Sequence, residues 1–98
     1  MDISLLDVSQ LIVVTDVFIV AGGTSRRHVR TLAEETELAL KAMDRRPLRR
    51  EGLEDSTWVL LDYGDVILHI FDPETRAYYD LERLWVDAPR IEFERAAS

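Results

Sequence analysis

The stretch from residue 58 to residue 71, Trp-Val-Leu-Leu-Asp-Tyr-Gly-Asp-Val-Ile-Leu-His-Ile-Phe, most strongly limits how this chain can fold. Two runs rich in Val, Ile, Leu and aromatic residues meet at Asp62-Tyr63-Gly64-Asp65, where Gly64 tolerates the positive φ of a tight turn. The pattern predicts a β-hairpin turning at Tyr63 and Gly64. The cross-strand pairs would then be Asp62 with Asp65, Leu60 with Ile67, and Trp58 with His69.

Side chains alternate along a strand, so the predicted hairpin has two different faces. One face is wholly aliphatic and is expected in the core: Val59, Leu61, Val66, Leu68 and Ile70. The other face carries a Trp, a His, two aliphatic residues and two carboxylates, and the opposed carboxylates should repel each other. An apolar face with charges of its own is typical of a surface that another molecule covers. An ordinary half-buried face, with Trp58 beneath a loop, fits the same pattern, and periodicity leaves both readings open.

Composition excludes several classes of protein. The chain has 98 residues, enough for one globular domain, and no cysteine, so disulfides, thiolate catalysis and Cys-ligated metals are excluded. A net charge of −7 argues against a general binder of DNA or RNA and favours a basic partner, for which ribosomal proteins are common examples. The longest apolar run is interrupted at Thr15-Asp16 and is shorter than a membrane span, and no secretory signal is present. We therefore expect a cytoplasmic protein without a membrane partner.

The other segments predict a mixed α/β fold. A short strand at 5–8 and a continuous apolar strand at 16–22 precede a helix that is capped at Thr24-Ser25 and extends to about Asp44. Pro47 separates this helix from a short strand ending near Glu51, and Asp72-Pro73 begins a second helix that extends to about residue 80. Residues 81–85 either continue this helix or form a separate turn. The order predicts a small mixed β-sheet flanked by helices, with the long helix packed on it.

The long helix begins with three cations, Arg26, Arg27 and Arg30, where the helix dipole disfavours positive charge. A broken local rule of this kind sometimes marks a functional surface. The alternative is that these are solvated arginines that pair with Glu34 or Glu35.

Evidence for catalysis is weak. The turn Gly22-Gly23-Thr24-Ser25, between a strand and a helix, resembles the phosphate-holding turn of nucleotidyltransferases. The metal-binding carboxylates that those enzymes carry on a following strand are absent here, because that strand is the cationic segment 47–50. His28 and His69 lie on different predicted elements and have no metal-ligand spacing. We expect no enzyme, no metal and no cofactor, and keep a nucleotide-handling enzyme as the alternative.

Five segments, in matching order and spacing between residues 5 and 85, resemble the ribosomal silencing factor family, RsfS, also called Iojap-like proteins. They are Leu6-Asp7-Val8, Thr15-Asp16-Val17-Phe18, Gly23-Thr24-Ser25-Arg26-Arg27-His28-Val29, Trp58 to Val66, and Tyr79-Asp80-Leu81-Glu82-Arg83-Leu84-Trp85. The resemblance implies a nucleotidyltransferase-like topology without the catalytic carboxylates. It implies one domain over residues 1–86. The C-terminal tail, residues 87–98, carries Pro89 and mixed charge and is expected to be loosely held. Family members usually carry a helix before the first strand, and this sequence begins almost on that strand.

The resemblance also implies a function. Family members bind universal large-subunit ribosomal protein fourteen at the face where the subunits join, exclude the small subunit, and so repress translation when nutrients are scarce. By this match, Trp58 stands on the partner-contacting strand, Asp62 to Asp65 form its turn, and His69 is the family's histidine. The expected partner-binding residues are Trp58, Leu60, Asp62, Tyr63, Asp65, Ile67, His69 and Phe71, with the two aspartates pairing to basic groups of the partner.

Three further expectations accompany the resemblance. Tyr79 and Trp85 are expected to have a core or edge role rather than a direct contact with the partner. Arg49 and Arg50 offer a minor contact to ribosomal RNA. A homodimeric interaction module that uses the Trp58 face, or a nucleotide-binding enzyme that uses the turn from Gly22 to Ser25, is the alternative function.

Overall fold

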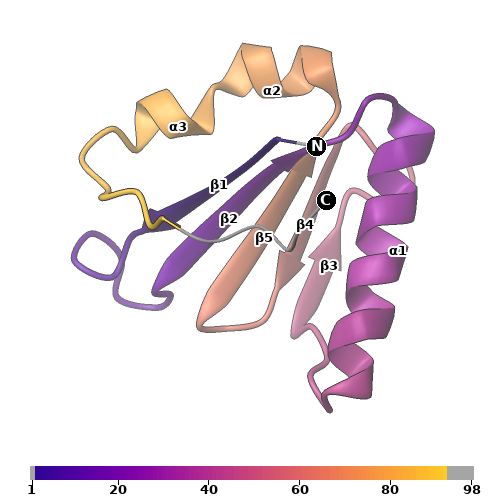
Figure 1. The fold of residues 1–98 in the computed structure, drawn as a ribbon, viewed down its shortest axis with the longest axis horizontal. Coiled ribbons are helices and arrows are strands. Elements are labelled where there is room, and N and C mark those ends of the chain that lie inside the picture. The colour runs from indigo at the N-terminus through magenta and orange to yellow at the C-terminus, as the bar shows by residue number, and fades with distance from the viewer. Residues whose placement is uncertain (1, 93–98) are drawn as a thin grey trace.

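A five-stranded mixed sheet with the strand order β1-β2-β5-β4-β3 forms the centre of the molecule (Figure 1). The computed structural model describes residues 2–92. The strands are β1 (Asp2–Asp7), β2 (Val17–Gly22), β3 (Arg49–Glu51), β4 (Trp58–Asp62) and β5 (Val66–Phe71), and the helices are α1 (Arg26–Ala42), α2 (Pro73–Tyr79) and α3 (Leu81–Leu84). The predicted α/β class and element order are confirmed, with boundaries shifted by a few residues. No helix within residues 2–92 is long and apolar enough to cross a membrane.

The central strands β2 and β5 run parallel, and every other neighbouring pair is antiparallel. The apolar run predicted as a buried strand is β2, which lies between β1 and β5. A strand in this position has both edges hydrogen-bonded and both faces near the core, so it needs apolar residues in succession. Phe18 and Val20 are buried on one face and Ala21 is buried on the other.

The register of the β4–β5 hairpin differs from the prediction by two residues. Trp58 pairs with Phe71, Leu60 with His69, and Asp62 with Ile67. The Tyr63 N–H donates to the Val66 carbonyl at 2.9 Å, so Gly64 and Asp65 form the turn.

The reason for this register lies in the backbone of the turn. Gly64 has φ +89°, and neither Tyr63 nor Asp65 has a positive φ. A type I′ turn at Tyr63-Gly64 would require a positive φ at both residues and would strain the backbone of Tyr63. The observed turn requires a positive φ only at Gly64. A shift of two leaves every residue on its predicted face, because side chains alternate with a period of two. Asp62 and Asp65 are not opposed, so the repulsion expected between them does not arise.

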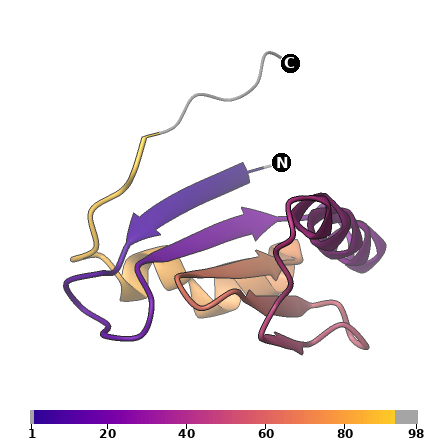
Figure 2. The ribbon, with the colours of Figure 1, turned by 90° about the horizontal axis from the view of Figure 1, so that it is seen from below.

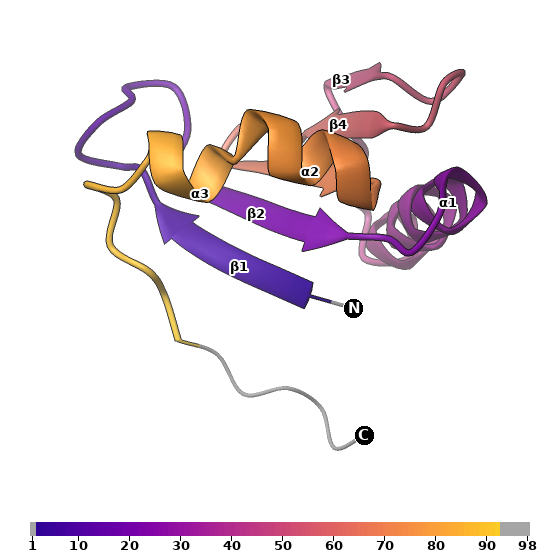
Figure 3. The same cartoon turned by 90° about the horizontal axis from the view of Figure 1, so that it is seen from above.

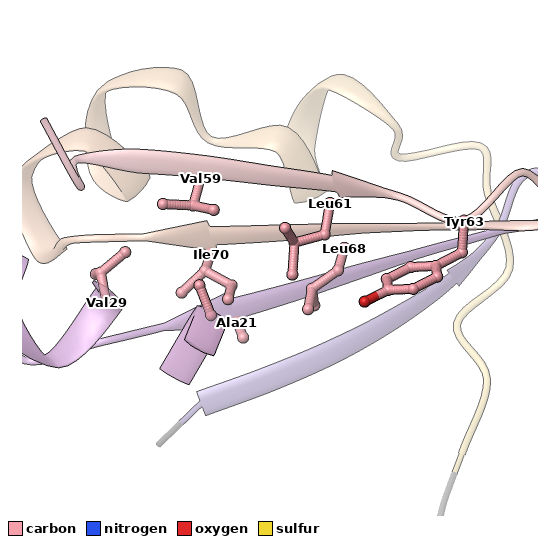
Figure 4. Packing of buried hydrophobic residues seen from close by; sticks show 8 residues of the cluster. Ala21, Val29, Val59, Leu61, Tyr63, Leu68 and Ile70 are labelled. Atoms are coloured by element: carbon pink, nitrogen blue, oxygen red, sulfur yellow. The ribbon is translucent and has the colours of Figure 1, made fainter. Parts of the chain in front are cut away.

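Helices cover both faces of the sheet, and they divide the core into two clusters (Figures 2 and 3). The α1 cluster contains four of the five residues predicted on the aliphatic face of the hairpin, together with residues of α1 (Figure 4). The fifth, Val66, is only partly buried and lies outside the cluster. The buried residues of the α1 cluster are Ala21, Val29, Ala33, Val59, Leu61, Tyr63, Leu68 and Ile70. The α2–α3 cluster lies on the other face, and its buried residues are Leu6, Val8, Phe18, Val20, Phe71, Leu81 and Ala88.

Local capping explains where the helices begin. The Ser25 side chain accepts from the His28 N–H at the start of α1, and the Asp72 side chain accepts from the Thr75 N–H at the start of α2. Both caps were predicted. Asp80 is left-handed, with φ +48°, and it ends α2, so residues 81–84 form the separate helix α3.

The segment after α3 returns to the edge of the sheet. The Asp7 N–H donates to the Pro89 carbonyl at 2.8 Å, and the Ile91 N–H donates to the Leu5 carbonyl at 2.9 Å. Ala88 is buried in the α2–α3 cluster. Residues 89–91 are therefore paired with β1 and Ala88 is packed in the core, so the expectation of a loose tail is wrong for these four residues. Residues 93–98 lie outside the described part of the chain.

Candidate functional site

Trp58 lies at the centre of an aromatic group on the face of the sheet that α2 and α3 partly cover. Its ring stacks on Phe71, its cross-strand neighbour, with 5.0 Å between centroids, and it contacts Tyr79 of α2 at 4.6 Å. Its indole N–H donates to Nδ1 of His69 at 3.1 Å. The indole is half-buried, so these contacts hold it in one orientation and leave part of it accessible.

His69 is buried, with 5% of its surface exposed. Because the indole nitrogen can only donate, Nδ1 of His69 must accept, and the proton of the neutral ring is on Nε2. Nε2 has no hydrogen-bond partner within the described residues. The imidazole and the Phe18 ring form a T-shaped contact with 4.9 Å between their centroids. Burial lowers the pKa of His69 to about 4, so the ring is neutral at pH 7 and accepts the Trp58 hydrogen bond.

Three of the eight predicted partner-binding residues are buried. Phe71 is 1% exposed beneath α2 and α3, His69 is 5% exposed, and Tyr63 is 8% exposed. Tyr63 also packs in the α1 cluster (Figure 4), whereas Trp58 packs against the α2–α3 cluster on the other face of the sheet. Side chains this deeply buried offer almost no area to a partner protein. The structure therefore places these three residues beneath the surface.

The other five predicted residues remain accessible and lie together. Because side chains alternate along a strand, one face of β4 carries Trp58, Leu60 and Asp62. Ile67 of β5 is the cross-strand partner of Asp62 and lies on the same face. All four are partly exposed, and Asp65 is exposed at the hairpin turn. We call Trp58, Leu60, Asp62, Asp65 and Ile67 the β4–β5 strip. It is an apolar centre with carboxylates at one end.

Both carboxylates of the strip have arginine partners within the chain. Asp65 Oδ1 lies 2.7 Å from Arg45 Nη2, and this hydrogen bond holds the pKa of Asp65 below its usual value. Asp62 Oδ2 lies 3.6 Å from Arg49 Nη2, and its other oxygen accepts from the Gly64 N–H at 2.8 Å. Both arginines are exposed, and surface ion pairs are weak, so a basic partner can replace the arginines at small cost.

A polar cluster around Glu82 fixes the helical layer that borders the strip. Glu82 Oε2 accepts from Ser4 Oγ of β1 at 2.6 Å, and Oε1 lies 3.0 Å from Arg76 Nη2 of α2. Burial raises the pKa of Glu82, but the hydrogen bonds from Ser4 and Arg76 and the charges of Arg76 and Arg90 outweigh burial and lower it overall. Nothing in the sequence pattern pointed to this cluster, because Ser4 and Glu82 are 78 residues apart.

The glycine turn before α1 uses its backbone N–H groups internally. The Gly23 N–H donates to the Phe71 carbonyl at 2.8 Å, and the Thr24 N–H donates to Nδ1 of His28 at 2.9 Å. A Cβ atom at Gly23 would lie 2.8 Å from Cγ2 of Val29, so this glycine lets α1 approach the sheet. Close packing therefore accounts for the turn. In residues 2–92 no group of three His, Asp or Glu side chains comes together in a way that could hold a metal ion.

Comparison with known proteins gives a family. A family model described as ribosomal silencing factor during starvation matches residues 1–98. The chain belongs to the RsfS family. Ribosomal silencing factor RsfS of Halalkalibacterium halodurans is 38% identical over 93 residues, which cover 95% of this chain and 80% of that protein. The RsfS family is a family of ribosome-related regulatory proteins, and the resemblance seen in the sequence is confirmed.

Two other relatives extend the comparison. Mitochondrial assembly of ribosomal large subunit protein 1 of Mus musculus is 32% identical over 87 residues, which cover 86% of this chain and 38% of that protein. The crystal structure of a Chromobacterium violaceum protein superimposes with a TM-score of 0.84 at 39% identity, covering 99% of this chain and 80% of that one. The α/β fold described above is therefore shared with this solved structure.

Proposed function

We propose that this RsfS-family chain is a translational repressor that binds the large ribosomal subunit through the β4–β5 strip and keeps the small subunit from joining. The observation that carries the proposal is the accessible strip itself, an apolar centre held in place by buried neighbours, in a chain of a family named for ribosome silencing. The name of the mouse relative refers to the large ribosomal subunit, which supports the same target.

The chemistry of the strip favours a basic protein as the direct partner. Asp62 and Asp65 stand at one end of its apolar centre, and the whole chain carries a net charge of −7. Universal large-subunit ribosomal protein fourteen, implied by the family resemblance, is such a partner. Complementary charge would mainly accelerate the encounter of the two proteins, and burial of the apolar centre would supply most of the affinity.

Trp58 is the proposed energetic centre of the contact. Buried aromatic anchors at the middle of an interface often lose about 2–4 kcal/mol of binding free energy on truncation to Ala. Phe71, Tyr79 and His69 hold the indole before any partner arrives. Such preorganisation reduces the entropy lost on binding.

The proposed mechanism is steric and involves no reaction. A protein bound where two subunits meet blocks their association by occupying the surface. No observation favours the nucleotide-handling alternative, because the N–H groups of Gly23 and Thr24 in the candidate phosphate turn already have partners within the chain. A homodimer through the same strip would compete with ribosome binding, and the cytoplasm is the proposed compartment.

Order of addition tests the proposal. Purified large subunits are incubated with the protein, small subunits are added, and joined ribosomes are separated from free subunits by sedimentation. We expect the protein to sediment with the large subunit and to reduce joining when it is added first. Unimpaired joining with the protein bound would refute the steric mechanism, and absence of binding would refute the target.

A further inference from the structure

Positive charge is concentrated in one part of this acidic chain. Residues 26–50 contain eight of the twelve Lys and Arg residues and four of the nineteen Asp and Glu residues, which gives this segment a net charge of +4. The rest of the chain carries −11. The segment comprises α1, the loop after it and the first two residues of the edge strand β3. These elements lie together at one side of the molecule (Figure 1), which is therefore its basic side.

A groove of about 620 Å³ lies between α1 and the β3 edge. Five cations and two carboxylates line it, together with the apolar residues Leu38, Pro47 and Leu53. We call this the α1–β3 groove. Its cations are Arg30, Lys41, Arg45, Arg46 and Arg50, and its carboxylates are Glu34 and Glu37.

All five cations of the groove are exposed, and four of them, all except Lys41, form ion pairs within the described part of the chain. Arg30 pairs with Glu34 at 3.3 Å and Arg50 pairs with Glu37 at 3.2 Å, and both arginines are more than half exposed. Exposed pairs are weak and exchange readily. Lys41, an exposed residue of α1, has no ion pair among the described residues.

The basic side is continuous with the β4–β5 strip. In β3, Arg49 is the cross-strand partner of Asp62, and Arg50 is the partner of Leu61. Cross-strand partners share a face, so Arg49 lies on the strip side and Arg50 lies on the α1 side. Cations therefore extend around the exposed edge strand from one surface to the other.

We propose that the α1–β3 groove binds the phosphodiester backbone of double-stranded RNA next to the protein that covers the strip. Four of the five lining cations are arginines, whose planar guanidinium groups match phosphate oxygens in pairs. No aromatic residue is among the described residues that line the groove, so it lacks the stacking platform of single-strand binders. Duplex RNA exposes mainly phosphates and hydroxyl groups, which this lining can contact without reading sequence. The proposal rests on the proposed function only for placing that RNA on the large ribosomal subunit.

The test measures binding of the full chain to a fluorescent RNA hairpin by anisotropy at low and moderate salt. Replacing both groove carboxylates, in Glu34→Gln/Glu37→Gln, should tighten binding about three- to tenfold, because phosphates no longer compete with them. The control Glu74→Gln/Asp87→Asn makes the same change in net charge on exposed residues outside the groove and should change binding less than twofold. The loss variant Lys41→Gln/Arg46→Gln should weaken binding about tenfold and reduce its salt dependence, as expected for two lost phosphate contacts. Its control is Arg27→Gln/Arg83→Gln, which changes two exposed arginines that do not line the groove.

The outcomes separate the groove from the strip. Equal effects of the groove variants and their controls would overturn the proposal. The proposal would also be overturned if polyglutamate displaced the hairpin as well as duplex RNA does at the same concentration of negative charge. If Trp58→Ala abolishes binding to large subunits and the groove variants change neither that binding nor hairpin binding, the proposed function stands and the groove proposal fails. If the hairpin binds as described but large subunits do not, the groove proposal stands and the proposed function fails.

Discussion

The indole N–H of Trp58 donates to Nδ1 of His69 across 3.1 Å, from one strand of the hairpin to the next. The bond joins a half-buried aromatic residue of the β4–β5 strip to a buried histidine. Within the described residues, Nδ1 of this histidine has no other hydrogen-bond partner. The bond requires a neutral imidazole, because a protonated ring has no acceptor. The orientation of the strip's central residue therefore depends on the protonation state of His69.

Acid should destabilise the protein through His69 before most carboxylates titrate. The pKa of His69 is about 4 in the fold, against an ordinary value of 6.5, so the unfolded state binds the proton first. Stability from this group is fully present above pH 6.5 and falls between pH 6.5 and 4. At pH 5 the loss is about 2 kcal/mol relative to pH 7. Denaturant unfolding at both pH values measures it, and His69→Gln, which cannot titrate, should remove this part of the pH dependence. An unchanged pH dependence in the variant would contradict the assignment.

Phe71→Ala should lower the free energy of unfolding by about 3–5 kcal/mol, because the removed ring fills a closed part of the α2–α3 cluster. The control is Tyr78, an aromatic residue of α2 whose surface is 79% exposed. Tyr78→Ala should change stability by less than about 0.5 kcal/mol. Chemical denaturation of both variants makes the comparison, and similar losses in the two would mean that Phe71 is not buried as described.

Glu82 and Ser4 should be energetically coupled. Glu82→Gln removes the charge from three charge-assisted contacts and should destabilise the fold by about 1–3 kcal/mol. In a double-mutant cycle with Ser4→Ala, a coupling energy of about 0.5–3 kcal/mol is expected for residues in direct contact. Additive effects would show that the hydrogen bond between β1 and α3 contributes nothing.

Gly64→Ala should cost about 1–2 kcal/mol, because alanine at φ +89° adopts a conformation that side chains disfavour. The Cβ atom itself has room, since its nearest contact is Leu48 Cδ1 at 3.4 Å. Gly64→Asn is the informative control, because asparagine tolerates positive φ better than alanine does. Thermal unfolding of the two variants should rank asparagine above alanine, and the reverse order would contradict the observed turn.

Local features of the sequence predicted much of this fold. The aliphatic face of the hairpin follows from alternation alone, and the caps Ser25 and Asp72 follow from short-range hydrogen bonding. The exact turn was missed because a turn at Tyr63-Gly64 and a turn at Gly64-Asp65 place every strand residue on the same face of the hairpin. Only the need to avoid a positive φ at Tyr63 distinguishes them.

The accessibility of the site residues was beyond such reasoning. Alternation places His69 and Phe71 on the strip face correctly, but it does not show that α2 and α3 cover them. That cover depends on contacts between distant segments, such as the hydrogen bond from Ser4 to Glu82 and the pairing of residues 89–91 with β1. Periodicity describes one element at a time, so it gives the face of a residue and not what packs above it.

The most direct measurement is the affinity of Trp58→Ala for purified large ribosomal subunits, compared with wild type and Tyr78→Ala at pH 7. Circular dichroism and denaturant unfolding establish beforehand that each variant is folded. We predict that Trp58→Ala loses about 2–4 kcal/mol of binding free energy, a decrease in affinity of at least tenfold, and that Tyr78→Ala binds like wild type. Wild-type affinity in a folded Trp58→Ala protein would contradict the claim that the β4–β5 strip is the ribosome-binding surface.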